Sequence, residues 1–564
     1  MYSDKKNIRE LVALLPEQGI DHIVLSPGSR NAPLLHTFSQ HPGFTCYTVV
    51  DERSAAFFAL GLAQNLQRPV ALCCTSGSAL LNYAPAISEA YYQKIPLLVI
   101  SADRPVQWLG QHDGQMIPQQ NALAGITNGS VQLPEIRTQE DAWYCNRLIN
   151  EAILALDKNG KGPSHINIPI SEPLYKFTDE PLPVPRVIHR HKPSVVADVE
   201  SGLQQLRSVS KCWILVGQMP PDNHLSNLLS QVARKYDALI VCEHPGNIHS
   251  VEAIRNMDAL LYTLTDEEQK ELAPDLLITL GGHLVSKRIK QYLRNQSITA
   301  HWRIDESEDV VDPFECLTDL ISVDPVVYFQ ALCAECDEAS ETGNYAGYWK
   351  SRAEEIAVRG ESWARKADYA DLTVVGEFLN RLPEGVALHL GNSSSIRNAQ
   401  LFPLPPGTNV YSNRGVSGID GVISTAVGFA ASNNQETYLI AGDLSFFYDM
   451  NALWNRHVSP HLHIMMMNNG SGGIFHLLPG ADQSAALNDY IACHHQTEAK
   501  AWAESRGFTY LSARNKTELG EALDIFTKSG SDKPLFLEVF TSHEVNPIVF
   551  KAYYHQLKST EYGN

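Results

Sequence analysis

Short apolar runs alternate along this chain with longer stretches in which apolar residues recur at helical spacing. Residues 22–25, 70–74 and 96–101 are apolar runs of this kind, and turn residues bound them. Such runs are typical of buried parallel strands, and their alternation with helical stretches is typical of α/β architecture. The pattern therefore predicts doubly wound parallel sheets.

The predicted strands fall into three groups that two linker-like segments separate. A proline-rich linker at 179–185 follows the first group, and the second group restarts at 212–217. That group closes near Val323, and a polar segment at 337–348 follows it. Composition shifts of this kind mark domain boundaries. We predict three α/β domains, at residues 1–180, 190–340 and 346–564.

The composition narrows the class of protein. At 564 residues with 44% hydrophobic residues, the chain is long enough for several domains of an ordinary globular protein. The net charge of −19 argues against a general nucleic-acid binder or a membrane-surface protein, because both need basic patches. No signal-peptide core follows Met1, and no apolar run approaches the roughly 20 residues that span a bilayer. We expect a cytoplasmic protein.

The ten cysteines do not show the regular spacing of a disulfide framework, which favours reduced thiols. Cys333 and Cys336 form a lone CxxC, and a zinc site would need a second ligand pair at short spacing. Cys316 is the only candidate near this CxxC in the sequence. We favour a coincidence of helical spacing over a metal or redox role.

Glu52 is the first candidate catalytic residue. It follows a predicted strand at 44–50 and precedes the apolar helical run 55–59. Because those neighbours exclude water, they should raise the pKa of the carboxyl group and favour its protonated form. The alternative is structural, since the helix dipole favours acids such as Asp51 and Glu52 at a helix N-terminus.

A second candidate site combines Asp443 with Asn469. Each residue follows a predicted strand, and one helix through residues 452–454 fits between the two strands. A βαβ unit would bring the two side chains to neighbouring strand ends, where open α/β sheets bind ligands. Carboxylate and amide oxygens suit Mg²⁺, whose coordination phosphate oxygens can complete. The alternative is a solvated turn at each strand end.

Together, in this order, the two candidate sites resemble those of the thiamine-diphosphate-dependent enzymes. Within that superfamily the chain resembles the SEPHCHC synthases, which join 2-oxoglutarate to isochorismate in menaquinone biosynthesis. SPGSRNAP at 26–33 and SNRGVSGIDG at 412–421 are the most specific motifs. The other stretches that carry the resemblance are 51–55, 75–79, 101–105 and 474–479.

The resemblance implies a cofactor, thiamine diphosphate, held with Mg²⁺ or Mn²⁺. It also implies decarboxylation of 2-oxoglutarate and 1,4-addition of the succinyl carbanion to isochorismate, a transferase reaction. Glu52 would be the catalytic residue, with a hydrogen bond to the aminopyrimidine ring. The implied metal ligands are Asp443, Asn469 and Ser471. The implied cofactor-binding residues are Glu52, Thr75, Ser417, Ile419, Gly442, Asp443, Leu444, Ser445, Asn469, Gly472, Gly473 and Ile474.

Both implied substrates are dicarboxylates, which gives a use to several basic residues, because guanidinium groups bind carboxylates bidentately. Without the resemblance, each of these residues would be read as a surface cation. For 2-oxoglutarate we expect Asn392, Ser393, Arg397 and Arg414. For isochorismate we expect Arg30, Arg104, Gln115 and Lys287, and for an apolar wall Ile474, Phe475 and Leu478. Ser29 is a further expected substrate-binding residue that we assign to neither substrate.

The family pattern also predicts how the domains work together. Domain 1–180 would bind the pyrimidine, domain 346–564 the diphosphate and metal, and domain 190–340 would be a central Rossmann-like domain. The glutamate domain of one subunit faces the metal domain of another in this superfamily. We therefore expect a homodimer or homotetramer with active sites at the subunit interface.

Three departures and three alternatives stay open. Gly114 replaces an amide residue of many relatives, Ser78 replaces a threonine, and the metal-loop assignment to Ser471 carries an uncertainty of about one residue. An acetolactate synthase or 2-oxoacid decarboxylase is the first alternative, although its smaller or neutral substrates need fewer basic residues. A non-catalytic regulator that binds the cofactor or an anion is the second. Dinucleotide binding at Gly281–Gly282 is the third, although GxGxxG is absent.

Overall fold

The computed structural model describes residues 1–190, 199–334, 344–478 and 480–558. These residues contain three six-stranded parallel sheets, so the predicted α/β class is confirmed. Cys336, Pro479 and the polar boundary at 337–343 lie outside the described residues. Within those residues no helix combines the length and the hydrophobicity needed to cross a membrane.

The chain forms two compact units rather than one unit for each sheet. Unit 1 contains Met1–Lys192, Gly415–Gln435 and Ser445–Leu462, and unit 2 contains Pro193–Arg414, Glu436–Leu444 and His463–Asn564. Unit 1 therefore holds the first sheet with two segments from late in the sequence. Unit 2 holds the second and third sheets.

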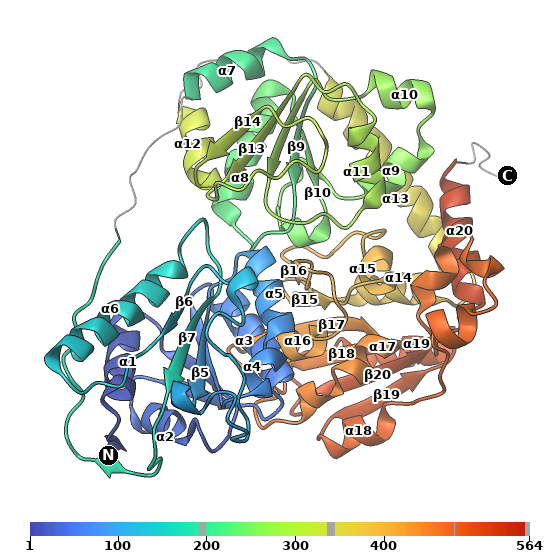
Figure 1. Ribbon diagram of the computed structural model, residues 1–564. Coiled ribbons are helices and arrows are strands. Elements are labelled where there is room, and N and C mark those ends of the chain that lie inside the picture. The colour runs from blue at the N-terminus through green and yellow to red at the C-terminus, as the bar shows by residue number, and fades with distance from the viewer. Residues whose placement is uncertain (191–198, 335–343, 479, 559–564) are drawn as a thin grey trace. The chain divides into compact units, whose positions relative to one another are not determined.

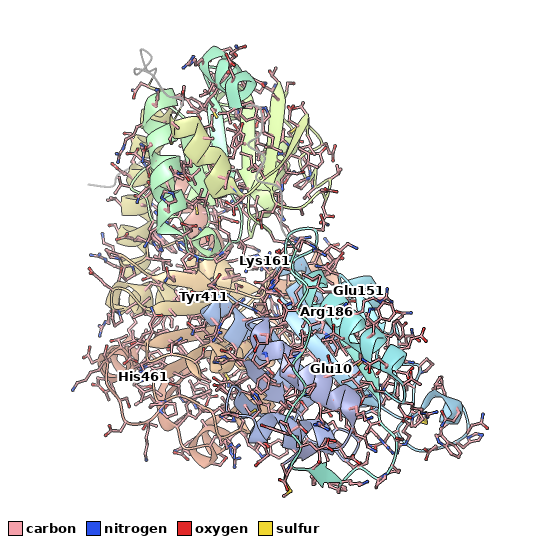
Figure 2. All side chains as sticks on the ribbon, turned by 90° about the vertical axis from the view of Figure 1, so that its left-hand side faces the viewer. Glu10, Glu151, Lys161, Arg186, Tyr411 and His461 are labelled. Carbon is pink, nitrogen blue, oxygen red and sulfur yellow. The ribbon has the colours of Figure 1, made fainter. Side chains whose placement is uncertain are left out.

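The first sheet has the strand order β3-β2-β4-β5-β7-β6. Its helices α1, α2 and α6 pack on one face, and α3 and α5 lie on the other (Figure 1). Glu10 of α1, which Figure 2 labels, accepts a hydrogen bond of 2.8 Å from Asn146 of α6. The strands are β2 (His22–Leu25), β3 (Thr45–Thr48), β4 (Val70–Cys74), β5 (Leu97–Asp103), β6 (Ser130–Gln132) and β7 (Ser164–Pro169); β1 (Tyr2–Ser3) pairs separately with β8 (Phe177–Thr178). The helices are α1 (Lys6–Glu17), α2 (Ala32–Gln40), α3 (Glu52–Leu66), α4 (Ser78–Asn82), α5 (Ala84–Gln93) and α6 (Gln139–Ala155).

The second sheet has the order β11-β10-β9-β12-β13-β14, which is the doubly wound order of a Rossmann fold. Helices α7, α8 and α12 cover one face, and α9, α11 and the first half of α13 cover the other. The strands are β9 (Cys212–Val216), β10 (Leu239–Cys242), β11 (Ala253–Ile254), β12 (Leu276–Leu280), β13 (Ala300–Asp305) and β14 (Asp319–Ser322). The helices are α7 (Val199–Ser208), α8 (Asn223–Tyr236), α9 (Met257–Thr263), α10 (Asp266–Glu271), α11 (Lys287–Arg294), α12 (Pro325–Ala334) and α13 (Tyr345–Lys366).

The glycines after β9 and β12 have a packing role. A Cβ on Gly217 would lie 2.0 Å from the carbonyl oxygen of Gly282, and Gly281 has a φ of +75°. The two loops also exchange hydrogen bonds, one of them 2.7 Å long from the Gly282 amide to the Gln218 carbonyl. Close approach of two strand-end loops therefore accounts for these glycines without a dinucleotide.

The third sheet repeats the order of the first, as β16-β15-β17-β18-β20-β19. Its core includes α14, α15, α19, α20 and the second half of α13, so α13 joins the cores of the second and third sheets. The strands are β15 (Ala387–Leu390), β16 (Asn409–Tyr411), β17 (Thr437–Gly442), β18 (Leu462–Asn468), β19 (Thr509–Ala513) and β20 (Leu535–Phe540). The helices are α14 (Asp371–Arg381), α15 (Ser394–Ala399), α18 (Lys500–Ser505), α19 (Lys516–Phe526) and α20 (Val545–Lys558).

The connection between β17 and β18 differs from the prediction. The expected helix through residues 452–454 is replaced by α17 (Asp443–Tyr448), which begins directly at Asp443, and by a 3-10 turn at Met450–Leu453. The buried Asp449 carboxylate accepts the Ser424 amide at 2.7 Å, at the start of α16 (Val422–Ala430). This long-range capping replaces a continuous helix and has no local sequence signature.

Helices α3 and α16 cross at two glycines within unit 1. A Cβ on Gly61 would lie 1.9 Å from the carbonyl oxygen of Thr425, and a Cβ on Gly428 would lie 2.1 Å from that of Phe58. The two backbones are therefore in direct contact. No side chain fits between them without moving one helix.

We predict that Gly61→Ala will lower the free energy of unfolding by about 2–3 kcal/mol, because the new methyl group overlaps backbone atoms of α16. Gly125→Ala is the matched control, because a Cβ at Gly125 meets nothing within 4 Å. Thermal and urea unfolding of both variants measure the effect. Equal stability of the two variants would contradict the described crossing.

Candidate functional site

In unit 1, four neighbouring strands of the first sheet carry candidate residues at their carboxyl ends. Arg30 follows β2, Glu52 follows β3, Thr75 follows β4 and Arg104 follows β5. These strands are consecutive in the order β3-β2-β4-β5. Parallel pairing therefore gathers the four loops at one edge of the sheet.

Glu52 is the first residue of α3, but Asp51 caps the helix. One Asp51 oxygen accepts the Ser54 amide at 3.1 Å, and the other accepts the Asn451 side chain at 2.9 Å. Among the described residues no other side chain hydrogen-bonds the Glu52 carboxyl. Burial raises the pKa of Glu52, a hydrogen bond from its own backbone amide opposes this, and the neighbouring Asp51 carboxylate adds to the rise. The capping explanation thus applies to Asp51 and leaves Glu52 available.

Thr75 carries a polar atom that suits a bound ligand. Its hydroxyl is buried and has no hydrogen-bond partner among the described residues. The side chain packs against Gly28, where an added Cβ would lie 2.4 Å from the Thr75 Cβ. Since buried hydroxyls are normally hydrogen-bonded, this atom fits the expected cofactor contact.

The two arginines of this edge are held by neighbouring groups. Arg30 is buried and donates 3.0 Å to the Ile170 carbonyl, while its other terminal nitrogen lies 3.1 Å from Glu172. Arg104 forms an ion pair of 3.0 Å with Asp113 and donates 3.3 Å to the carbonyl of the exposed Gln115. The structure thus brings Arg104 and Gln115 together.

Glu89 is a buried acid that the sequence did not single out. Its carboxylate accepts the Gly415 amide at 2.6 Å and the Val416 amide at 2.8 Å. These bonds tie α5 to the loop that carries the expected cofactor residues Ser417 and Ile419. A lone glutamate in an amphipathic helix gives no signal of a partner 326 positions away.

In unit 2, the third sheet uses the matching four strands. Asn392 and Ser393 follow β15, Arg414 follows β16, Asp443 follows β17 and Asn469 follows β18. These strands are consecutive in the order β16-β15-β17-β18. Parallel pairing gathers these residues at one edge of the third sheet.

Asp443 is buried and is held by backbone amides. One oxygen accepts the Leu444 amide at 2.7 Å, and the other accepts the amides of Gly470 at 2.8 Å and Ser471 at 3.3 Å. His495, which the sequence did not indicate, lies 3.4 Å from the second oxygen, and interaction with this carboxylate raises the histidine pKa. The loop after β18 is thereby fixed against the end of β17.

The orientation of the Asn469 side chain shows whether Asp443 and Asn469 fit a cation. Its amide nitrogen donates 3.0 Å to the buried Asp371, and its amide oxygen is buried without a hydrogen-bond partner among the described residues. Asp371 also accepts the Thr541 hydroxyl at 2.5 Å, which fixes the carboxylate. This arrangement turns the amide nitrogen toward Asp371 and leaves the oxygen for a ligand, as supporting residues do around metals. The residues therefore fit a divalent cation.

The loop beyond Asn469 needs glycine for its conformation and its close packing. Gly470 has a φ of +68°, and a Cβ on Gly472 would lie 2.9 Å from the Phe475 ring. Ile474 and Phe475 lie in a 3-10 turn at Gly473–Leu477, and neither is fully buried. The backbone amides at 470–473 are all hydrogen-bonded within the protein, so they hold the shape of the loop.

Unit 2 also contains a cavity of about 340 Å³. Lys287 and Arg397 both line it, although the sequence assigned them to different substrates. Burial lowers the pKa of Arg397, whose guanidinium donates 2.6 Å to the Ser393 carbonyl. Leu477 lines the cavity, whereas Leu478 is not among the lining residues.

One buried acid that the sequence did not indicate, Glu243, holds the backbone next to a cation of this region. Glu243 lines the cavity and accepts the amides of Val285 at 2.5 Å and Ser286 at 2.8 Å, directly before Lys287. Arg414 donates 2.8 Å to the Asn392 side chain and does not line the cavity. The division of the cations between two substrates therefore stays a prediction.

We predict that Asp443→Ala will weaken Mg²⁺ binding by about tenfold or more, because it removes a carboxylate from the cation site. Asp524→Ala is the matched control, since its side chain is 74% exposed and pairs only with the surface residue Arg381 in the described contacts. Calorimetric titration with Mg²⁺ in the presence of thiamine diphosphate measures both variants. An unchanged dissociation constant for Asp443→Ala would exclude this role.

Comparison with protein families matches all three parts of the chain. Residues 8–123 match the N-terminal TPP binding domain of thiamine pyrophosphate enzymes, and residues 391–539 match the C-terminal TPP binding domain. Residues 187–375 match the middle domain of this class. These matches support a thiamine pyrophosphate cofactor.

Curated relatives match over nearly the whole chain. A 2-succinyl-5-enolpyruvyl-6-hydroxy-3-cyclohexene-1-carboxylate (SEPHCHC) synthase of Bacteroides thetaiotaomicron is 47% identical, covering 99% of this chain and 100% of the relative. The synthase of Phocaeicola vulgatus is 45% identical with the same coverage. That of Flavobacterium psychrophilum is 40% identical over 97% of this chain and 98% of the relative. The chain therefore belongs to the SEPHCHC synthase family of thiamine-pyrophosphate enzymes.

Proposed function

We propose that this chain decarboxylates 2-oxoglutarate and adds the remaining succinyl unit to isochorismate, a reaction of menaquinone biosynthesis. Full-length similarity to SEPHCHC synthases is the observation that carries this proposal. Thiamine diphosphate, when bound, supplies the electron sink that lets a 2-oxoacid lose CO₂. The protein's contribution is to bind, orient and polarise the reacting groups.

Glu52 would hold a proton against the aminopyrimidine ring of the cofactor. Its raised pKa supports this role, because the protonated carboxyl persists to a higher pH than in an ordinary glutamate. Asp51 supports the role indirectly, since it caps α3 and leaves the Glu52 carboxyl free of that task.

Asp443, Asn469 and the Ser471 carbonyl would hold Mg²⁺ or Mn²⁺ together with the diphosphate. The buried Asn469 oxygen without a partner supports this proposal, because a cation would satisfy it. Hard oxygen ligands suit both ions, so we propose no preference between them.

The basic residues would bind the carboxylates of both substrates against the chain's net charge of −19. Arg397 and Arg414 would serve 2-oxoglutarate, and Arg30, Arg104 and Lys287 would serve isochorismate. Partial burial strengthens such pairs, because surrounding protein screens charge less than water does. The half-buried Arg397 and the buried Arg414 therefore support strong carboxylate binding.

We further propose that the enzyme is a homodimer or homotetramer with active sites between subunits. Glu52 belongs to unit 1, whereas Asp443 and Asn469 belong to unit 2. A site that needs all three residues can thus draw them from two copies of the chain, as the family resemblance implies. The cytoplasmic location stays a prediction.

We expect the full chain with thiamine diphosphate, Mg²⁺, 2-oxoglutarate and isochorismate to release CO₂ and form an adduct. The adduct's mass, measured by mass spectrometry, should equal the sum of the two substrates minus CO₂. CO₂ release without an adduct would favour a 2-oxoacid decarboxylase, and no CO₂ under any condition would favour a non-catalytic regulator.

Glu52→Gln should still bind the cofactor in calorimetry. The C2 hydrogen of the bound cofactor should exchange much more slowly than in the wild-type protein, because the proton relay is lost.

Complementation tests the shared site. Glu52→Gln and Asp443→Ala homodimers should each be nearly inactive. If each site takes Glu52 from one subunit and Asp443 from the other, a mixed dimer contains one site with both native residues. Subunit exchange between the two variants should therefore restore about a quarter of the wild-type activity. No recovery, despite exchange verified by native mass spectrometry, would show that one chain supplies both residues.

A further inference from the structure

Away from the site described above, three potential metal ligands meet in the second sheet. His301 lies on β13, and Asp312 and Cys316 lie in the loop between β13 and β14. One ligand atom from each residue lies within 4.8 Å of the other two. The family resemblance gives these residues no role.

His301 is oriented as a metal ligand would be. The side chain is fully buried, and its Nε2 lies 2.9 Å from the Thr279 hydroxyl. Because that hydroxyl donates 3.4 Å to the Trp302 carbonyl, it accepts the Nε2 proton. The lone pair is then on Nδ1, which has no hydrogen-bond partner among the described residues and lies 3.9 Å from Asp312.

A simple ion pair does not account for this contact. The His301 side chain is fully buried, and Asp312 is the acid nearest to its Nδ1 in the described ion pairs. The separation of 3.9 Å between His301 Nδ1 and the Asp312 oxygen is too long for a hydrogen bond. The buried lone pair thus lacks a partner that would offset its desolvation.

The loop is held so that its two ligands face this lone pair. Asp312 accepts the Cys316 amide at 3.1 Å, and the Thr318 hydroxyl bonds the His301 backbone at both its amide and its carbonyl. The Phe314 ring is buried at 5.7 Å from the imidazole. Asp312 is exposed and Cys316 is half-buried, so an ion can enter from solvent.

The ligand types select among metals. Imidazole nitrogen, carboxylate oxygen and thiolate sulfur together suit Zn²⁺, with a fourth position left for water. Mg²⁺ and Ca²⁺ prefer oxygen ligands alone. The positive charge of Arg303 on the same strand opposes any cation, but this arginine is paired with Asp305.

We propose that His301, Asp312 and Cys316 bind a zinc ion that fastens the β13–β14 loop to the second sheet. Binding forms a metal–sulfur bond and releases the thiol proton to solvent. His301 releases no proton, because Nδ1 already presents its lone pair. Because a thiol must lose its proton to bind a metal, the affinity should increase as the pH rises.

Cobalt titration tests the site by a signal that the proposed Asp443 site cannot give. Full-length protein, stripped of metal and supplied with excess Mg²⁺ to fill the Asp443 site, is titrated with Co²⁺. We expect one equivalent to bind with a sulfur-to-cobalt charge-transfer absorption, which Zn²⁺ then abolishes by displacement. The Asp443 and Asn469 site contains no thiolate and cannot give this band.

Variants assign the band to Cys316. Cys316→Ser should lose the band, and Asp312→Asn should weaken cobalt binding by about tenfold or more. Cys333→Ser and Cys493→Ser, matched thiol controls in the same unit, should keep it. Absence of a band in the wild-type protein, its survival in Cys316→Ser, or its loss in Cys493→Ser would each overturn the proposal. Circular dichroism of each variant verifies folding.

Discussion

Parallel pairing of strands is the constraint on which both candidate sites depend. Neighbouring parallel strands end at the same edge of a sheet, so loops distant in sequence become neighbours there. The first and third sheets have the same strand order, and in each the same four consecutive strands carry the candidate residues. The same arrangement of strands therefore occurs twice, with Glu52 and arginines at one sheet edge and the proposed cation ligands at the other.

Buried carboxylates then orient the side chains and loops at these sheet edges. Asp371 turns the amide of Asn469, Glu89 holds the loop before Ser417, and Glu243 holds the loop before Lys287. Each carboxylate is buried and accepts at least two hydrogen bonds, so its removal would leave unpaired donors in the protein interior. These acids position candidate ligands without being candidate ligands themselves.

The sequence predicted the strands well, because a buried parallel strand is a local apolar run. The order of the motifs and their resemblance to a known family predicted the family, which the comparisons confirm. The positioning acids could not be predicted, since Asp371 and Asn469 are 98 positions apart and neither has a local partner. The prediction of a helix through residues 452–454 was wrong for a similar reason, because it depends on a distant contact. Asp449 caps α16, 25 positions away, and the chain does not continue as a helix. The residue-level assignments of substrates stay predictions.

The path of the chain between the two compact units limits how its domains can be exchanged between homologues. The chain passes from one unit to the other five times, at residues 192–193, 414–415, 435–436, 444–445 and 462–463. A fragment cut at the proline-rich linker would carry α3 without α16, and would expose the surface where the backbones meet at Gly61 and Gly428. Exchange of the first domain between homologues by a single recombination point would therefore join two helices that had not evolved together. Helices α3 and α16 therefore have to come from the same parent sequence, although more than three hundred residues separate them in the chain.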